Sequence, residues 1–182
     1  GRHTSRRCKD HAVYPYLLRN LTIDRPNQVW ATDITYIPME KGFMYLVAII
    51  DIYSRYTVNW SISNSMDAEW CKETLEEAIQ MHGKPEIINT DQGSQFTSEE
   101  FSSFVLSQDI RLSMDGKGRA TDNAFIERLW RNIKYEKIYL NPPKDGLDLY
   151  RMVNEYFNYY NNERRHESLD YQKPVNWYQA VA

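Results

Sequence analysis

The feature that most constrains the fold is a run of three strand-like segments joined by short turns, within residues 28–62. Residues 28–37 alternate between two faces, as the side chains of a β-strand do. Residues 43–50, with the sequence FMYLVAII, are continuously apolar and have the length of one buried strand. Residues 56–62 form a third segment of the same kind. Because the links are only a few residues long, we expect an antiparallel meander.

Helical and strand patterns alternate in the rest of the chain. Periodic apolar positions predict a helix over residues 67–82, and residues 86–89 predict a short strand. Further helices are expected from residue 97, over residues 121–139 and over residues 145–162, with a fifth strand at residues 110–113. This order predicts an α/β fold: a mixed five-stranded sheet, with three antiparallel strands followed by two further strands, flanked by helices.

Composition and charge narrow the class of protein. The 182 residues are 42% hydrophobic and 26% charged, which is typical of a globular domain. The longest apolar run, residues 43–50, is far shorter than the roughly 20 residues that span a bilayer, so we expect no membrane partner. A net charge of −3 argues against a nucleic-acid binder. However, basic residues concentrate in residues 1–25 and 111–137, which weakens that objection.

The two cysteines, Cys8 and Cys71, form no CxxC pair and have no histidine at metal-ligand spacing. Cys71 lies among apolar helix positions, so we expect it in the core. Such sparse use of cysteine favours a reducing cytoplasm over an oxidising compartment.

Three carboxylates, on three different elements, carry the chemical signal. Asp33 lies in the first strand among apolar neighbours, where its charge needs a partner. Asp91 directly follows the strand at residues 86–89, and Glu127 lies on the helix at residues 121–139. If the three converge, divalent cations would remove their mutual repulsion, and hard oxygen ligands suit Mg²⁺ or Mn²⁺. Two such ions can promote in-line displacement at phosphorus.

Each acid also has a structural interpretation. Isolated acids in strands and turns are commonly helix caps, turn formers or ion-pair partners. Asp51, at the end of the second strand, is expected in a hairpin role with Ser54 and Arg55. Asp122 is expected to cap the helix that carries Glu127.

Three blocks of sequence resemble the motifs of one enzyme family. They are TDITYIP at residues 32–38, NTDQGSQFTSEEF at 89–101 and DNAFIERLWRNIKYE at 122–136, and 35 residues separate Asp91 from Glu127. Together they resemble the integrase-core transposases of bacterial insertion sequences, the branch that is similar to retroviral integrases. The resemblance covers residues 14–178, and its closing pattern includes Tyr160, Asn161, Asn162, Arg165, His166, Leu169, Tyr171 and Pro174.

The resemblance implies a ribonuclease-H-like fold with Asp33, Asp91 and Glu127 as catalytic residues and metal ligands. It implies two Mg²⁺ or Mn²⁺ ions, hydrolytic nicking of a donor DNA end, and attack of the freed 3′-hydroxyl on a target duplex. It also implies a homo-oligomer in the active complex, in a cytoplasmic protein that associates with the nucleoid when acting.

The resemblance also identifies candidate DNA contacts. Lys134, seven residues after Glu127, matches a basic residue of the family that contacts donor-end DNA; its structural alternative is a solvated neighbour of Glu127 on the helix. Gln95, Lys117 and Arg119, in two loops, are further candidates.

We expect three regions: a basic flank at residues 1–25, left from a missing N-terminal DNA-binding region; an integrase catalytic core at 26–163; and a C-terminal tail at 164–182. Two alternatives to a transposase stay open. One is a two-metal nuclease of the same ribonuclease-H-like fold, and the other is a non-catalytic DNA-binding or assembly module that retains this fold.

Overall fold

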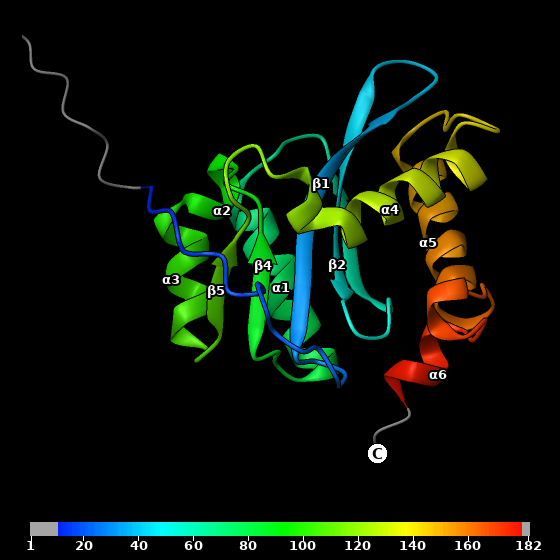
Figure 1. The fold of residues 1–182 in the computed structure, drawn as a ribbon. Coiled ribbons are helices and arrows are strands. Elements are labelled where there is room, and N and C mark those ends of the chain that lie inside the picture. Colours follow the sequence, from blue (N-terminus) through cyan, green and yellow to red (C-terminus); the bar gives the residue numbers. More distant parts are fainter. Residues whose placement is uncertain (1–10, 180–182) are drawn as a thin grey trace, which may run out of the picture.

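A computed structural model describes residues 11–179 and shows a five-stranded sheet between two layers of helices (Figure 1). The strands are β1 (Val29–Pro38), β2 (Phe43–Asp51), β3 (Thr57–Ser63), β4 (Ile87–Thr90) and β5 (Arg111–Met114). The helices are α1 (Ala68–His82), α2 (Ser94–Thr97), α3 (Glu99–Ser107), α4 (Ala124–Ile133), α5 (Gly146–Asn162) and α6 (Pro174–Tyr178). Three short turns of helix are η1 (Ala120–Asn123), η2 (Lys134–Ile138) and η3 (Glu167–Leu169).

The sheet confirms the predicted meander. Its strand order is β3-β2-β1-β4-β5, with β2 antiparallel to both β1 and β3, and with β4 and β5 parallel to β1. The central strand β1 therefore has β2 on one side and β4 on the other. Because parallel strands point the same way, the residues that follow β4 and β5 emerge at the same end of the sheet.

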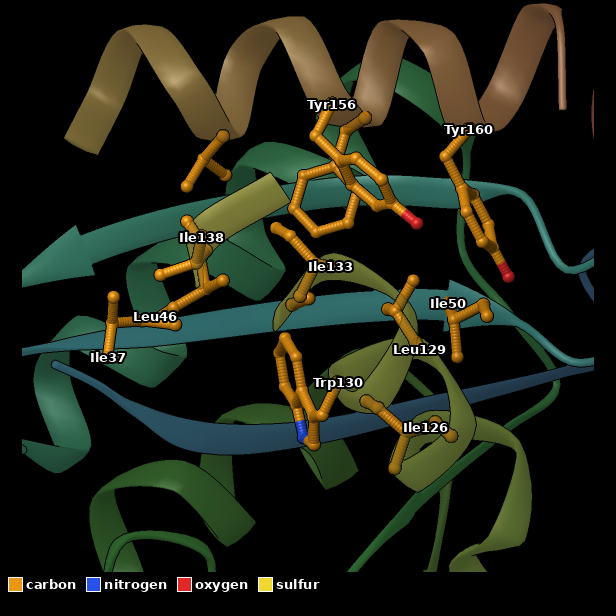
Figure 2. Close-up of a cluster of buried hydrophobic side chains, with 14 of the residues drawn as sticks. Ile37, Leu46, Ile50, Ile126, Leu129, Trp130, Ile133, Ile138, Tyr156 and Tyr160 are labelled. Carbon is orange, nitrogen blue, oxygen red and sulfur yellow. The ribbon is translucent and has the colours of Figure 1, made fainter. Parts of the chain in front are cut away.

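Each face of the sheet has its own hydrophobic core. On one face Val29 and Ala31 pack with α4 and α5, whose buried side chains Leu129, Trp130 and Tyr156 lie together in Figure 2. On the other face, alternate residues of β1 and β2 pack against α1 and α3. The predicted alternation of residues 28–37 is thus explained by a strand that is covered on both faces, and Cys71 is buried in the second core, as expected.

Two local expectations were wrong. The helix around Glu127 begins with the 3₁₀ turn η1, and Asn123 precedes α4, so Asp122 does not cap it. The Asp122 carboxylate instead accepts a hydrogen bond from the Gly116 amide at 3.1 Å. Residues 92–95, expected as a loop, lead into the short helix α2, which carries Gln95.

The segments on either side of the expected core pack against it. Leu17, Leu21 and Ile23 contact the first core, and Leu169 is buried. Tyr178 on α6 donates a hydrogen bond to the Asn27 side chain at 2.8 Å. The parts of the expected flank and tail at residues 1–10 (with Cys8) and 180–182 lie outside the described residues, and the region boundaries stay predictions. Among the described helices, none is long and apolar enough to cross a membrane.

Candidate metal and nucleic-acid site

The first carboxylate lies in the middle of the sheet. Asp33 on β1 is only 7% exposed, and the Trp130 indole donates a hydrogen bond to its Oδ2 at 3.1 Å. Figure 2 shows this indole nitrogen pointing from α4 toward β1. Trp130 is a residue of the first core and therefore also orients a buried carboxylate.

The second carboxylate lies at the same level of the neighbouring strand. Ala31 on β1 pairs with Asn89 on β4. Asp33 lies two residues after Ala31, and Asp91 lies two residues after Asn89, so the two acids are at the same height along the sheet. Side chains two residues apart lie on the same face of a sheet, and adjacent strands are roughly 4.8 Å apart. The Asp91 Oδ1 atom accepts a hydrogen bond from the Gly93 amide at 2.7 Å, which fixes the carboxylate at the start of its loop.

The third carboxylate approaches from the helix that covers this end of the sheet. Glu127 is exposed in the first turn of α4, and α4 packs against β1. Burial and the neighbouring Asp91 charge raise the pKa of Asp33 well above its ordinary value, against the hydrogen bond from Trp130, and Glu127 adds to the rise. The charges of Asp91 and Glu127 therefore both act on Asp33, and the convergence of the three acids on one metal site stays a prediction.

An open cleft of about 370 Å³ contains two of the three acids. It is lined by Asp91 and Glu127, together with Lys117 and Arg119 from the loop after β5. The loop after β5 therefore places two cationic side chains beside the carboxylates. This position suits side chains that contact a polyanion.

Lys134 also reaches the acidic region. Its Nζ donates a hydrogen bond to Thr35 Oγ1 on β1 at 2.7 Å, two residues from Asp33. Partial burial lowers the pKa of Lys134, while the charges of Glu127 and Asp33 act in the opposite direction. Its ammonium group is therefore directed toward β1 and the acids, unlike the freely solvated helix neighbour that was the structural alternative.

Gln95 is the candidate that does not line the cleft, although its Oε1 and Asp91 Oδ1 both approach Gly93 from the same side. The Gln95 amide donates to the Met66 carbonyl at 3.4 Å, on the α1 side of the loop. Asp51, by contrast, has its expected hairpin role, since it accepts hydrogen bonds from the Asn27 amide and from Ser54.

Sequence reasoning missed Asp115. This residue directly follows β5 and lines the cleft with Asp91 and Glu127. Burial raises the pKa of Asp115 to about 6 against a hydrogen bond from Asn89 at 2.7 Å, and neighbouring acids raise it further. The available signal was the one that identified Asp91: an acid immediately after a parallel strand.

The donor chemistry of the site fits a hard divalent cation, because its groups are carboxylate oxygens whose repulsion a cation would offset. Asp33 lies on β1 and Asp91 directly follows the adjacent strand β4, and Glu127 and Asp115 border the same cleft as Asp91. Across residues 11–179, no three His, Cys, Asp or Glu side chains are grouped closely enough to hold a metal ion.

Known proteins match this chain in sequence. The integrase core domain model matches residues 23–120, and a second integrase core domain model matches residues 108–174. The transposase for insertion sequence element IS904 of Lactococcus lactis subsp. lactis (strain IL1403) is 36% identical over 155 residues, 84% of this chain and 61% of the relative. Transposase InsF for insertion sequence IS3A of Escherichia coli (strain K12) is 35% identical over 147 residues, 78% of this chain and 50% of the relative. The chain therefore spans about half to three-fifths of the length of these relatives.

Solved structures match the fold. The HTLV-2 integrase catalytic core domain in complex with magnesium has a TM-score of 0.69 at 23% identity and covers 85% of this chain and 98% of that chain. A simian T-cell lymphotropic virus intasome chain has a TM-score of 0.74 at 20% identity and covers 94% of this chain and 60% of that chain. The fold is ribonuclease-H-like, as predicted, and the chain belongs to the integrase core domain family, as found in insertion-sequence transposases.

Proposed function

We propose that this chain is the catalytic core of a DNA transposase, which cleaves a DNA strand and transfers its 3′-hydroxyl end to a target duplex. The observation that carries the proposal is the position of Asp33 on β1 beside Asp91, which directly follows the adjacent strand β4, with the Glu127 helix packed against β1. In an integrase core domain, this arrangement suits metal-dependent chemistry at a phosphodiester.

Asp33, Asp91 and Glu127 would hold the divalent cations, Mg²⁺ or Mn²⁺, two per site. Bound cations would activate the attacking oxygen and stabilise the leaving oxygen during displacement at phosphorus. A solved relative in fold, the HTLV-2 integrase core, is in complex with magnesium. That likeness and the carboxylate donors of this chain support the choice of metal.

The protein's own groups position the DNA. Trp130 holds one oxygen of Asp33, and the Gly93 amide holds one oxygen of Asp91, so both carboxylates are oriented before substrate arrives. Lys134, Lys117 and Arg119 would contact backbone phosphates around the reacting bond. A DNA contact by Gln95 stays a prediction, since Gln95, on α2, does not line the cleft.

The active complex would be a homo-oligomer, because transposition joins two ends of one element to a target. The solved HTLV-2 cores, described as dimeric and trimeric forms, support this expectation.

The test is a strand-transfer reaction. We expect the chain, Mn²⁺, a donor duplex with a free 3′-hydroxyl and a target duplex to give joined products. Chelation of the metal, or the change Asp91→Asn, should reduce product at least about a thousandfold. Chelation would remove the cations, and Asp91→Asn would remove one of the carboxylates proposed to hold them. Glu100→Gln, at an exposed acid on α3, is the matched control and should leave the yield unchanged.

Two outcomes would decide against strand transfer. Metal-dependent hydrolysis without joining would assign the chain to the nucleases of this fold. Equal activity of the wild type and Asp91→Asn would remove Asp91 from the site and favour a non-catalytic DNA-binding or assembly module.

A further inference from the structure

A second cavity lies where the C-terminal segment meets α4. It has a volume of about 570 Å³, and its lining includes Arg128 and Asn132 from α4, with Arg164, Arg165 and His166 from the segment after α5. These residues are not part of the lining of the acidic cleft. Three guanidinium groups around one cavity destabilise the folded chain, because like charges repel one another.

Arg164 is the preorganised member of this set. Two of its nitrogens bind the Glu136 carboxylate, at 2.7 and 3.1 Å, and its guanidinium lies over the Tyr160 ring at 5.8 Å. Tyr156 donates a further hydrogen bond to Glu136 at 2.7 Å. The remaining nitrogen of Arg164 faces His166 at 3.4 Å. The guanidinium is therefore fixed in orientation before any ligand enters.

Arg128 and Arg165 lack a counter-charge. Both are exposed, and within residues 11–179 neither forms an ion pair. Arg165 donates to the Tyr171 carbonyl at 3.0 Å, which anchors its side chain beside the cavity. Glu167 also lines the cavity, but it is one acid among three arginines.

An independent sign of excess positive charge comes from His166. Burial lowers the pKa of His166 to about 4, and the charges of Arg164 and Arg55 lower it too, with only Glu136 acting in the opposite direction. Arg55 itself is partly buried over the Phe125 ring at 4.0 Å, and Arg128 is among the charges that lower its pKa. Among the described residues, the arginines around the cavity thus outnumber its two carboxylates, Glu136 and Glu167.

The position of the cavity indicates which anion. Glu127 lines the acidic cleft and Arg128, the next residue of α4, lines the cavity, so the two hollows flank one helix. Successive helix residues point about 100° apart, and Arg128 and Asn132 are about 6 Å apart along the axis. A polyanion that reaches Glu127 therefore needs to extend only one or two nucleotides, at 3.4 Å of rise each, to reach Arg128.

We propose that the cavity of Arg128, Asn132, Arg164, Arg165 and His166 binds a backbone phosphate of the DNA strand whose reacting phosphate lies in the acidic cleft. The proposal rests on the proposed function. Guanidinium groups suit phosphate because their paired N–H groups match its oxygens, and Asn132 can donate an amide hydrogen bond. The C-terminal segment would then be part of the DNA-binding surface as well as a packing element.

Binding in the absence of metal tests the proposal. The probe is a fluorescent duplex of about 30 base pairs, with the 182-residue chain, EDTA and a series of salt concentrations. We expect Arg128→Gln combined with Arg165→Gln to weaken binding about tenfold and to lower the slope of log K against log salt by about 1, because one phosphate contact is lost. Both side chains are exposed, so the variant should remain folded.

The matched control is the double change Arg151→Gln with Lys72→Gln. It removes the same charge outside the cavity, at the exposed Arg151 of α5 and the half-buried Lys72 of α1, and should change affinity and slope much less. If both double variants lost the same affinity and the same salt slope, the effect would come from net charge alone, and the proposal would be overturned. Binding of inorganic phosphate to the cavity, with an unchanged DNA slope, would also overturn it.

A cross-link locates the DNA. In a Cys8→Ser background, Ser168→Cys at the cavity rim should form a disulfide with a duplex that carries thiol tethers on its phosphates. Ser103→Cys, exposed on α3, should react at least about tenfold less. Equal yields at both cysteines would contradict the proposal. Neither the binding assay nor the cross-link involves catalysis. A failure of this proposal can therefore be distinguished from a failure of the proposed strand transfer.

Discussion

At the scale of single residues, the acidic site lowers the stability of the folded chain. Asp33 is almost fully buried, and its charge is disfavoured by burial and by Asp91. The Trp130 indole offsets this with a side-chain hydrogen bond, and the Ile34 backbone acts in the same direction. Such a carboxylate is costly to the folded chain until a cation neutralises it, which is typical of functional sites.

Asp33→Asn should therefore stabilise the metal-free protein. An asparagine keeps an acceptor for Trp130 and removes the repulsion, so we expect the free energy of unfolding in EDTA at pH 7.5 to rise by about 1–2 kcal/mol. Mg²⁺ should raise the Tm of the wild type and have a smaller effect on the variant. Thermal unfolding with and without Mg²⁺ measures both.

Asp51→Asn is the control. Asp51 is equally buried but accepts hydrogen bonds from two backbone amides and a hydroxyl, so this change should destabilise the chain without altering the response to Mg²⁺. A destabilised Asp33→Asn variant would contradict the idea that charge repulsion dominates at Asp33.

At the scale of elements, the turn between β4 and α2 determines where the Asp91 carboxylate points. A Cβ added to Gly93 would lie 2.8 Å from Asp91 Oδ1 and 3.0 Å from Gln95 Oε1. The backbone of Gly93 is otherwise ordinary, with φ of −60°. This glycine is thus required by the close approach of a side chain rather than by its own conformation.

Gly93→Ala should displace the Asp91 carboxylate and reduce strand transfer about ten- to a hundredfold, since a shift of about 1 Å can have such an effect. The Tm should change by only a few degrees, because the side chain can rotate away. Gly146→Ala is the control: its Cβ would meet Met44 at an ordinary 3.4 Å, and activity should persist. Full activity of Gly93→Ala would show that the Asp91–Gly93 contact does not matter.

At the scale of the whole molecule, a cluster of Glu136, Arg164 and His166 connects η2 to the segment that follows α5. Burial opposes the charge of Glu136, but hydrogen bonds from Arg164 and Tyr156 hold its pKa below the ordinary value. The pKa of His166 is lowered to about 4. Both folded-state pKa values lie below their unfolded values, so both groups contribute stability at neutral pH that is lost as the pH falls.

We therefore expect the free energy of unfolding to fall between pH 6.5 and pH 4, with about 1 kcal/mol from His166 after solvent screening is allowed for. Urea denaturation at pH 7, 5.5 and 4.5 measures this. His166→Gln should flatten the upper part of that decline, whereas His82→Gln, at a less perturbed histidine, should flatten it less. A decline that is unchanged in His166→Gln would rule out its protonation as a cause.

The sequence alone determined most of the sheet, and it identified the three acids as candidate metal ligands. Alternation in residues 28–37, the apolar run at 43–50 and the short links leave few ways to bury the strands, so the meander could be predicted. Asp33 and Asp91 were found because they stand at defined places on strands, where the backbone fixes side-chain direction. Asp115 carried the same signal after β5, but it lies in none of the three motif blocks, whereas Asp91 lies in one.

Only the tertiary structure decided how the helices and the C-terminal segment sit on this sheet. Packing turned Trp130 toward Asp33, directed Lys134 to Thr35, and kept Gln95 outside the cleft. It also brought Arg164 and Arg165 beside Arg128, which lies far away in sequence. Local periodicity reports which face of a helix is buried, but contacts between distant segments depend on how both cores are filled, and no local pattern contains that information.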